Sequence, residues 1–451
     1  MYNSQLDTTT TIIAPATATG GAVMVVRLSG KDAISIADKM FRGRKKLTEA
    51  KGYTLHYGTI VDSNEVTIDD VVVALFRAPH SYTGDDTVEI TLHGSEYITS
   101  EVIRLAIGYG ATMATPGEFT RRAFLAGKMD LSRAEAVADI IASDSRWSHN
   151  VASTQMRGGY SDKLSELRGE LLRLCSLLEL ELDFSEEDVE FADRTTLRHT
   201  LEIINTQIDS LKSSFALGNV LKNGVNVAIV GEPNVGKSTL LNALIEDDRA
   251  MVSDIAGTTR DTIEATTTID GIRYRFVDTA GIHTTDDKLE QMGIDRSFRA
   301  IANAHIILHL ASAEQPEFSH IEHSDEQHYI QVINKIDKLT SSDALTKNEL
   351  LYISAKSGIG MDDLRTHLRK ITDTTHLSSG SIVVSNMRHY SALNRASEAL
   401  ADARRGMSMN ISSDLLSEDI RRVLHSLGEI TGEITSDDIL HNIFSKFCIG
   451  K

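Results

Sequence analysis

The sequence predicts a multidomain protein that combines α/β with all-α architecture, and three observations support this. The chain has 451 residues, which is too long for a single hydrophobic core. Short β-rich runs alternate with helical segments in two separate stretches, whereas runs of helical periodicity fill the rest. One alternating stretch, residues 218–379, lies between two helical stretches, so it is predicted to be inserted into a discontinuous helical bundle.

Residues 1–122 are predicted to form an N-terminal α+β domain. Runs rich in β-branched residues indicate strands, and amphipathic segments between them indicate helices. The expected strands are 22–28, 71–78 and 87–93, and the expected helices are 32–41 and 95–108.

Residues 123–217 and 380–451 are predicted to be the two parts of the helical bundle. Their apolar residues step by three and four positions, as in Leu164, Leu167 and Leu171 or in Leu416, Ile420 and Val423. The acid-rich stretch 179–193 predicts a solvated turn. Ser436, followed by two aspartates, predicts the capped start of a last helix.

The composition excludes several classes of protein. Residues 1–11 lack a basic and an apolar region, so no signal peptide is expected, and no apolar run is long enough for a membrane helix. We therefore expect a cytoplasmic protein, with Cys175 and Cys448 as reduced thiols. The net charge of −18 argues against broad electrostatic binding of nucleic acid, so an RNA contact would need a local basic patch.

A phosphate-binding loop lies at the start of the inserted stretch. An apolar run ends at Gly231, a loop leads to Gly236, Lys237 and Ser238, and a helical pattern follows. The glycines let backbone N–H groups surround phosphates, and the helix N-terminus adds partial positive charge. Lys237 is expected to reach the terminal phosphates and Ser238 to ligate Mg²⁺. Taken alone, this loop also fits an ATPase.

Four further motifs complete the nucleotide site, and one of them selects guanine. Asp278 to Gly281 places a carboxylate and a glycine N–H beside Mg²⁺ and the γ-phosphate, and Gly257 to Arg260 supplies Thr259 as a second Mg²⁺ ligand. Asn334 to Asp337 offers a carboxylate to the N1 and N2 donors of guanine, which adenine lacks. Ser354 to Lys356 supports the base through a backbone amide. Together they predict a GTPase, that is, a GTP hydrolase.

Two positions depart from Ras-like proteins. Ile282 stands where those proteins have the glutamine that orients the attacking water, so another residue must hold the water. Asn234 in the phosphate loop has an amide oxygen that can ligate a monovalent cation. The alternative is that Asn234 only bonds its own loop; the absent glutamine favours a potassium-assisted site.

The motifs resemble the TrmE–Era–EngA clade of the TRAFAC GTPases, and the flanking segments resemble the MnmE/TrmE family of tRNA-modification GTPases. The segments that carry the second resemblance are 116–124, 128–136, 182–184, 432–436 and 447–451, which ends in Cys-Ile-Gly-Lys. The resemblance covers essentially the whole chain. It implies an N-terminal dimerisation and folate-binding domain (1–122), a helical domain in two parts (123–217 and 380–451) and an inserted Ras-like P-loop G domain (218–379).

The motifs and the resemblance together assign site residues. The K⁺ ligands fall on Asn234, Ser253, Ile255 and Thr258, and the water-orienting acid falls on Glu290, which without the resemblance would be a solvated acid at a helix start. Position 283, often arginine in the family, is His283. The residues expected at GTP are Asn234, Val235, Gly236, Lys237, Ser238, Thr239, Ser253, Asp254, Ile255, Ala256, Gly257, Thr258, Thr259, Asp278, Thr279, Ala280, Gly281, Asn334, Lys335, Asp337, Ser354, Ala355 and Lys356.

The resemblance also implies a 5-formyl-tetrahydrofolate or a related folate. Its residues fall on Arg27, Glu89, Lys128 and Lys451, which suits a pterin that donates to a carboxylate and a tail that needs cations. Cys448 is either a reactive thiol near the folate or a packed cysteine at a helix end.

The implied activity is addition of a carboxymethylaminomethyl or aminomethyl group at C5 of the wobble uridine of certain tRNAs. The implied partners are a second copy of the chain, tRNA, and MnmG (GidA) in a heterotetramer or larger complex. Two alternatives fit the sequence less well. An Era-type ribosome-assembly switch would need a basic RNA-binding module after the G domain, whereas the helices after residue 380 are acidic. A one-carbon transferase with a vestigial G domain conflicts with the intact nucleotide motifs.

Overall fold

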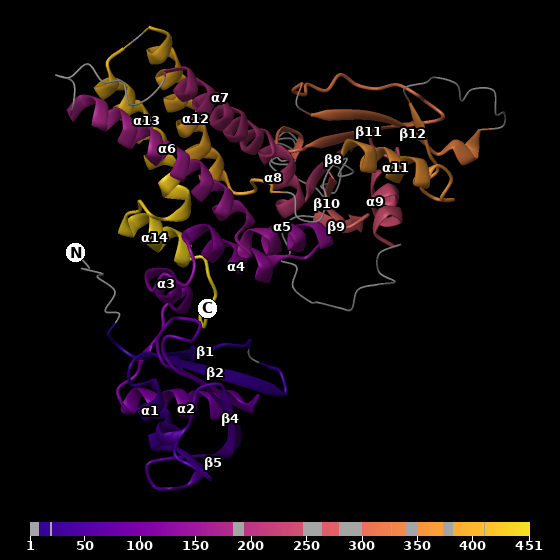
Figure 1. The fold of residues 1–451 in the computed structure, drawn as a ribbon. Coiled ribbons are helices and arrows are strands. Elements are labelled where there is room, and N and C mark those ends of the chain that lie inside the picture. The colour runs from indigo at the N-terminus through magenta and orange to yellow at the C-terminus, as the bar shows by residue number, and fades with distance from the viewer. Residues whose placement is uncertain are drawn as a thin grey trace, which may run out of the picture. The chain divides into compact units, whose positions relative to one another are not determined.

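The computed structural model forms two compact units, one made of Met1–Ala138, Ser161–Asp193 and Arg405–Lys451, the other of Asp139–Tyr160 and Arg194–Arg404. Figure 1 traces the chain and labels its elements. The residues described are 9–18, 20–183, 194–246, 264–278, 300–325, 327–339, 350–372, 382–409 and 411–451.

The first unit contains a seven-stranded sheet in the order β3-β4-β5-β6-β2-β1-β7. Its neighbours run antiparallel except for β1 and β7, which are parallel. The strands are β1 (Ile12–Pro15), β2 (Val23–Ser29), β3 (Phe41–Gly43), β4 (Thr54–Val61), β5 (Thr67–Phe76), β6 (Thr87–His93) and β7 (Thr112–Met113).

Two helices cover the core of this sheet, α1 (Ala33–Met40) and α2 (Glu96–Gly108), and a short 3₁₀ turn η1 spans Leu47–Glu49. Along β5 buried and exposed residues alternate, because successive side chains of a strand point to opposite faces. The Ser95 side chain accepts from the Ile98 amide and caps α2. The core therefore lies on one face of β4 and β5, and the side chains on the other face are exposed or partly exposed.

The helices of the first unit join segments from both ends of the chain. They are α3 (Glu118–Leu125), α4 (Leu131–Ala142), α6 (Gly159–Asp183), α13 (Ser413–Thr431) and α14 (Asp437–Phe444), of which α4 and α6 also extend into the other unit. Leu131 and Ala134 pack with Phe444. The Ser436 side chain caps α14, as predicted.

The predicted acidic turn at 179–193 is wrong for its first residues, because α6 continues to Asp183. Glu181 is buried and accepts a hydrogen bond of 2.7 Å from the Ser413 hydroxyl, and Glu179 pairs with Arg421 at 2.6 Å. These acids remain helical because α13 supplies their partners. Residues 184–193 lie outside the described residues.

The second unit contains a six-stranded sheet in the order β13-β12-β11-β8-β10-β9, parallel except for β9 against β10. Its strands are β8 (Val225–Gly231), β9 (Glu264–Ile269), β10 (Ile272–Asp278), β11 (Ile306–Ser312), β12 (His328–Asn334) and β13 (Leu351–Tyr352). Val227 and Ile229 pack in one core cluster, and Ala228 and Val230 in another. Both faces of β8 are thus covered, as expected for a central parallel strand.

Among the helices of the second unit, those that precede the inserted stretch pack against one that follows it. They are α5 (Arg146–Met156), α7 (Arg194–Ser213), α8 (Phe215–Asn223), α9 (Lys237–Glu246), α11 (Met361–Ile371) and α12 (Met387–Ser408), with a 3₁₀ turn η3 (Ile336–Lys338). Lys212 on α7 donates to Ser397 on α12 at 3.0 Å, and Phe215 stacks on Tyr390. No helix in the described ranges is long and apolar enough to cross a membrane.

The predicted fold class is confirmed: an N-terminal α+β sheet, helices paired from both sides of an insertion, and a mainly parallel P-loop sheet. The predicted strands and helices of the N-terminal region match β2, β5, α1 and α2 with shifted ends, and they match β6 at both ends. Four strands of that sheet, β1, β3, β4 and β7, were not predicted; β3 and β7 are too short to show a period. The domain boundaries at 122, 217 and 379 stay predictions.

Candidate nucleotide and folate sites

The phosphate loop lies between β8 and α9, at the carboxyl end of the central strand of the sheet. The chain continues from β8 to β9 and β10 on one side, whereas it continues from the neighbouring β11 to β12 on the other side, so the two connections run in opposite directions. In open α/β sheets ligands bind outside the carboxyl ends of strands at such a point. The sheet therefore places the loop where a phosphate site is expected.

Lys237 holds its ammonium group over the phosphate loop. The side chain is buried, and its Nζ donates to the carbonyl oxygens of Gly231 at 2.6 Å and Glu232 at 2.7 Å. Ser238 and Thr239 follow in the first turn of α9, and Val235 is packed in the sheet core. A cation at the start of a helix suits the binding of an anion.

Gly236 is required at its position by both conformation and space. Its φ of +100° lies in the region that only glycine adopts freely. A Cβ there would come within 2.4 Å of Nδ2 of Asn334. The loop consequently packs directly against the guanine motif.

Asn334 connects three predicted motifs. It is 2% exposed, its Nδ2 donates to the Val235 carbonyl at 2.9 Å, and its Oδ1 accepts from the Ala355 amide at 3.0 Å. One side chain thus fixes the phosphate loop, the Asn-Lys-x-Asp motif and the Ser-Ala-Lys motif relative to one another. Buried amides that are hydrogen-bonded on both sides in this way order their surroundings.

Asp337 is oriented by Ser354, whose hydroxyl donates to Oδ1 of Asp337 at 2.5 Å. This hydrogen bond lowers the pKa of Asp337, and the charges of Lys356 and Lys338 act in the same direction. The carboxylate therefore stays ionised at neutral pH, as an acceptor for two guanine donors must. Lys335 has φ +65° and donates to the Asn234 carbonyl at 2.5 Å, which links the two loops again.

Several predicted residues lie outside the described residues: Ser253, Asp254, Ile255, Ala256, Gly257, Thr258, Thr259, Thr279, Ala280, Gly281, Ile282, His283 and Glu290. Asp278 is described only as the last residue of β10. The described part of the nucleotide site therefore consists of the phosphate loop and the two base motifs.

The first unit brings together two of the four predicted folate residues. Arg27 on β2 pairs through Nε with Oε1 of Glu89 on β6 at 2.8 Å, because the two residues face each other across the strands. Its Nη1 donates to the Gly450 carbonyl at 3.1 Å. The guanidinium also lies 5.6 Å from the ring centres of Tyr82 and Phe119, within the range of cation–π attraction.

Sequence reasoning missed the aromatic part of this cluster. Tyr82 was not singled out, and Phe119 appeared only inside the segment 116–124. The only signal for Phe119 in the sequence was its place in that family-like segment. The Tyr82 ring, the Arg27 cation and the partly exposed Glu89 carboxylate are groups that fit a flat heterocycle with N–H donors, whereas the Phe119 ring is fully buried.

The other predicted residues of this site are Lys128 and two residues at the chain end, Cys448 and Lys451. Lys128 donates to the Pro79 carbonyl, in the segment that leads to Tyr82. The Lys451 amide donates to the Cys448 carbonyl at 3.3 Å, and the Gly117 amide donates to the same carbonyl at 3.4 Å. Cys448 is exposed, so the packed-cysteine alternative is not what the structure has.

A phosphate loop and a guanine-selecting motif joined on a mainly parallel sheet define a P-loop GTPase, a GTP hydrolase. Residues 131–448 match the family model of the MnmE helical domain, and residues 11–128 match that of the GTP-binding protein TrmE N-terminus. The chain belongs to the MnmE family of tRNA modification GTPases.

Two relatives agree with this assignment, and one solved structure aligns with a smaller part of the chain. The chain is 48% identical to the tRNA modification GTPase MnmE of Flavobacterium johnsoniae, over 98% of this chain and 99% of that protein. It is 49% identical to that of Bacteroides thetaiotaomicron, with the same coverage. Aquifex aeolicus Era bound to GDP·AlF4⁻ aligns at 27% identity and a TM-score of 0.25, over 38% of this chain and 65% of that one.

Proposed function

We propose that this protein is a K⁺-activated GTPase that acts with MnmG (GidA) on tRNA. The reaction is addition of a carboxymethylaminomethyl or aminomethyl group at C5 of the wobble uridine, and GTP hydrolysis with G-domain dimerisation drives the conformational cycle. The observation that carries the proposal is family similarity over 98% of the chain together with a connected guanine site. The cytoplasm is the proposed location.

The nucleotide chemistry follows from the described side chains. Lys237 neutralises charge on the phosphates, and Asp337 accepts from the base, so GTP is held at both ends. Ser238, with Thr259, would hold Mg²⁺, which when bound neutralises charge on the β- and γ-phosphates. The position of Ser238 in the first turn of α9, next to Lys237, fits that task.

Asn234 is the proposed K⁺ ligand on the described part of the chain, with Ser253, Ile255 and Thr258 as the others. It is exposed, and its φ of +64° is a left-handed conformation that asparagine tolerates better than most residues. Lys335 donates a hydrogen bond to the Asn234 carbonyl, which fixes the backbone that carries this side chain. When bound, K⁺ supplies positive charge beside the phosphates.

Glu290 is proposed to orient the attacking water, because Ile282 has no hydrogen-bonding group. Arg27, Glu89, Lys128 and Lys451 are proposed to bind 5-formyl-tetrahydrofolate or a related folate, with Tyr82 and Phe119 beside them. Supporting this, Arg27 retains donors beyond those that bind Glu89 and Gly450, because a guanidinium has five. Cys448, exposed next to this cluster in sequence, is proposed as a reactive thiol.

A homodimer is proposed for the first unit. Tyr53 and Leu55, with Tyr57, are about 70% exposed at alternate positions leading into and along β4, and Val72 faces Tyr57 from β5. Adjacent exposed apolar side chains of this size mark an interaction surface. Since the stripe lies on the face of the sheet opposite the core, a second copy can cover it.

The proposal is tested first by GTP hydrolysis in K⁺ and in Na⁺ buffers. We expect a large increase in K⁺ that Asn234→Ala abolishes while GDP affinity stays nearly unchanged. Glu290→Ala should slow single-turnover hydrolysis by roughly 10²–10⁴-fold without weakening GTP binding. Equal rates in the two salts would rule out the cation site, and hydrolysis within threefold of wild type would remove Glu290 from its role.

The tRNA reaction is tested separately. Nucleosides of tRNA from a deletion strain, analysed by mass spectrometry with and without the restored gene, should lack and regain the modified wobble uridine. An unchanged nucleoside profile in the deletion strain would contradict the tRNA assignment while leaving the GTPase intact.

A further inference from the structure

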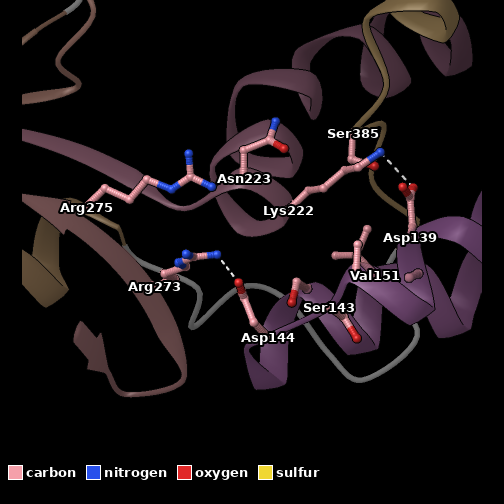
Figure 2. Close-up of a pocket in the computed structure, with 12 residues that line it drawn as sticks. Asp139, Ser143, Asp144, Val151, Lys222, Asn223, Arg273, Arg275 and Ser385 are labelled. Carbon is pink, nitrogen blue, oxygen red and sulfur yellow. Dashed lines mark hydrogen bonds and ion pairs between the residues drawn. The ribbon is translucent and has the colours of Figure 1, made fainter. Parts of the chain in front are cut away.

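A small pocket lies in the second unit, and none of its lining residues belongs to the phosphate loop or to the base motifs. Its volume is about 160 Å³, and its walls come from the end of α4, from α5, α8 and β10, and from Ser385. Figure 2 shows side chains from all of these segments directed into one space. Pockets for drug-sized ligands measure about 300–1,000 Å³. The pocket is therefore too small for a nucleoside but large enough for a small ion with water.

Positive charge predominates in this pocket. Lys222, Arg273 and Arg275 line it together with Asp139 and Asp144, so one positive charge is in excess. Lys222 pairs with Asp139 at 2.7 Å, and Arg273 pairs with Asp144. The two carboxylates are thus each matched by a cation, and the unmatched charge is that of Arg275.

Arg275 is held beside Arg273 by the geometry of the strand. The two arginines are two residues apart on β10, and the intervening Tyr274 is in the core, so both face away from that core. In the parts of the chain that the structure describes, the Arg275 side chain has no hydrogen-bond or ion-pair partner. Burial and the neighbouring Arg275 charge lower the pKa of Arg273. Two like charges on one face favour an anion between or above them.

Ser385 supplies an independent sign of a missing ligand. It is 5% exposed, and its Oγ is buried without a hydrogen-bond partner among the described residues. A buried hydroxyl without a partner is energetically unfavourable, so such groups are normally paired. The backbone beside it is fixed, because the Val384 amide donates to Ser214 Oγ at 3.0 Å. The hydroxyl therefore remains in the pocket wall.

We propose that this pocket binds free orthophosphate, with Arg275 and Ser385 as its direct ligands and with Arg273 and Lys222 supplying the surrounding positive field. Orthophosphate matches the size, the excess positive charge and the unsatisfied hydroxyl, because it is a compact anion with several acceptor oxygens. The site is separate from the one that binds the phosphates of GTP. It joins β10, which ends at Asp278, to α5 and α8, so an occupied site ties the sheet to those helices.

The test is a titration of the full chain with orthophosphate, followed by calorimetry, with Mg²⁺ and GDP present to fill the nucleotide site. We expect Arg275→Gln to weaken binding by about tenfold or more and Ser385→Ala by roughly 2–10-fold, from the usual strengths of charged and neutral hydrogen bonds. Arg369→Gln is the matched control, since Arg369 is an exposed arginine of the same unit that pairs with Asp270 outside the pocket. Unchanged binding in Arg275→Gln would overturn the proposal.

Two further variants distinguish binding in this pocket from a loss of folding and from binding at the phosphate loop. Arg275→Lys keeps the charge and should bind within about tenfold of wild type, which distinguishes loss of the anion site from loss of the fold. Lys237→Ala, titrated without nucleotide, should retain orthophosphate binding. If that variant abolishes binding, the anion sits at the phosphate loop and the proposal fails, whether or not the GTPase assignment holds.

Dimethyl phosphate is the probe for the alternative source of the same chemistry, an RNA phosphodiester. It has one charge and two free oxygens, so it should bind more weakly than orthophosphate. Equal or tighter binding of dimethyl phosphate would overturn the assignment to free phosphate.

Discussion

The nucleotide site of the second unit and the Arg27 cluster of the first unit are built in different ways. The nucleotide site consists of short runs of consecutive residues, each at a strand end, and Asn334 then joins them. The Arg27 cluster has no such run: Glu89 is 62 positions from Arg27, and Gly450 is 423 positions away.

This difference decides how much each site depends on the rest of the chain. In the nucleotide site, backbone geometry within a motif does most of the positioning, as the φ values of Asn234, Gly236 and Lys335 show. The Arg27 cluster depends on two strands and the chain end meeting. Changes in the nucleotide site should therefore alter ligand selection sharply. Changes in the Arg27 cluster should instead weaken the contacts between its strands and the chain end.

Asp337→Asn should give the largest effect, because an amide donates where guanine requires an acceptor. GTP affinity should fall by about 10²–10⁴-fold, from the loss of two charge-assisted hydrogen bonds, while XTP binding rises. Competition between the two nucleotides measures this. Unchanged GTP affinity would contradict the assignment of the base motif and with it the view that local motifs determine this site.

Gly236→Ala should weaken GTP binding by about 10²-fold, because backbone strain of about 1–3 kcal/mol adds to the contact with Asn334. Gly110→Ala is the matched control: its φ is +110°, but nothing lies within 4 Å of the added Cβ. If both variants bind GTP equally well, the phosphate loop and Asn334 are not coupled as the structure indicates.

Acid should destabilise the second unit through His309. This side chain is 1% exposed and accepts or donates one hydrogen bond of 2.6 Å with Tyr329, and burial, with the Lys237 charge, lowers its pKa to about 4. In the unfolded chain a histidine titrates near 6.5. Between these values only the unfolded state gains the proton, so stability is lost as pH falls from about 6.5 to about 4.

The loss should amount to roughly 2–3 kcal/mol. Urea unfolding of wild type and of His309→Gln at pH 7.5, 5.5 and 4.5 checks it, with GDP release reporting on this unit. The variant should lack this part of the pH dependence. Parallel curves for the two proteins would show that another group is responsible.

Gly450→Ala should have the smallest effect and should stay within the first unit. Its φ is +95°, and an added Cβ would lie 2.0 Å from the Pro15 carbonyl oxygen. The chain end can move away, so the cost is limited to the Arg27 contact, about 1–2 kcal/mol of unfolding free energy. Binding of 5-formyl-tetrahydrofolate should weaken, and GTP affinity should not change.

Gly127→Ala serves as the control for this variant, since its φ is also positive and nothing lies within 4 Å of the added Cβ. Thermal unfolding and calorimetry measure both variants. A fall in GTP affinity in Gly450→Ala would mean that the two sites do not respond separately, which would remove the contrast between the two regions.

The sequence by itself determined the class of fold and the nucleotide, and it predicted the residues that bind this nucleotide. This was possible because a phosphate loop is a local structure: glycines, a lysine and a helix start must follow one another for backbone amides to surround a phosphate. Helical and strand periodicity likewise predicted β6, α2 and the paired helices on either side of the insertion, since burial imposes a period on the chain.

Only the tertiary structure decided which distant groups meet. The partners of Arg27, the helical conformation of Glu181 opposite Ser413, and the meeting of Arg275 and Ser385 in one pocket all depend on how strands and helices pack. A charged or polar residue has no period that reveals its partner, because it can pair with any complementary group brought within hydrogen-bond distance. The sequence therefore singled out Arg27 and Glu89 individually, and the fold assigned their partners and those of the other groups.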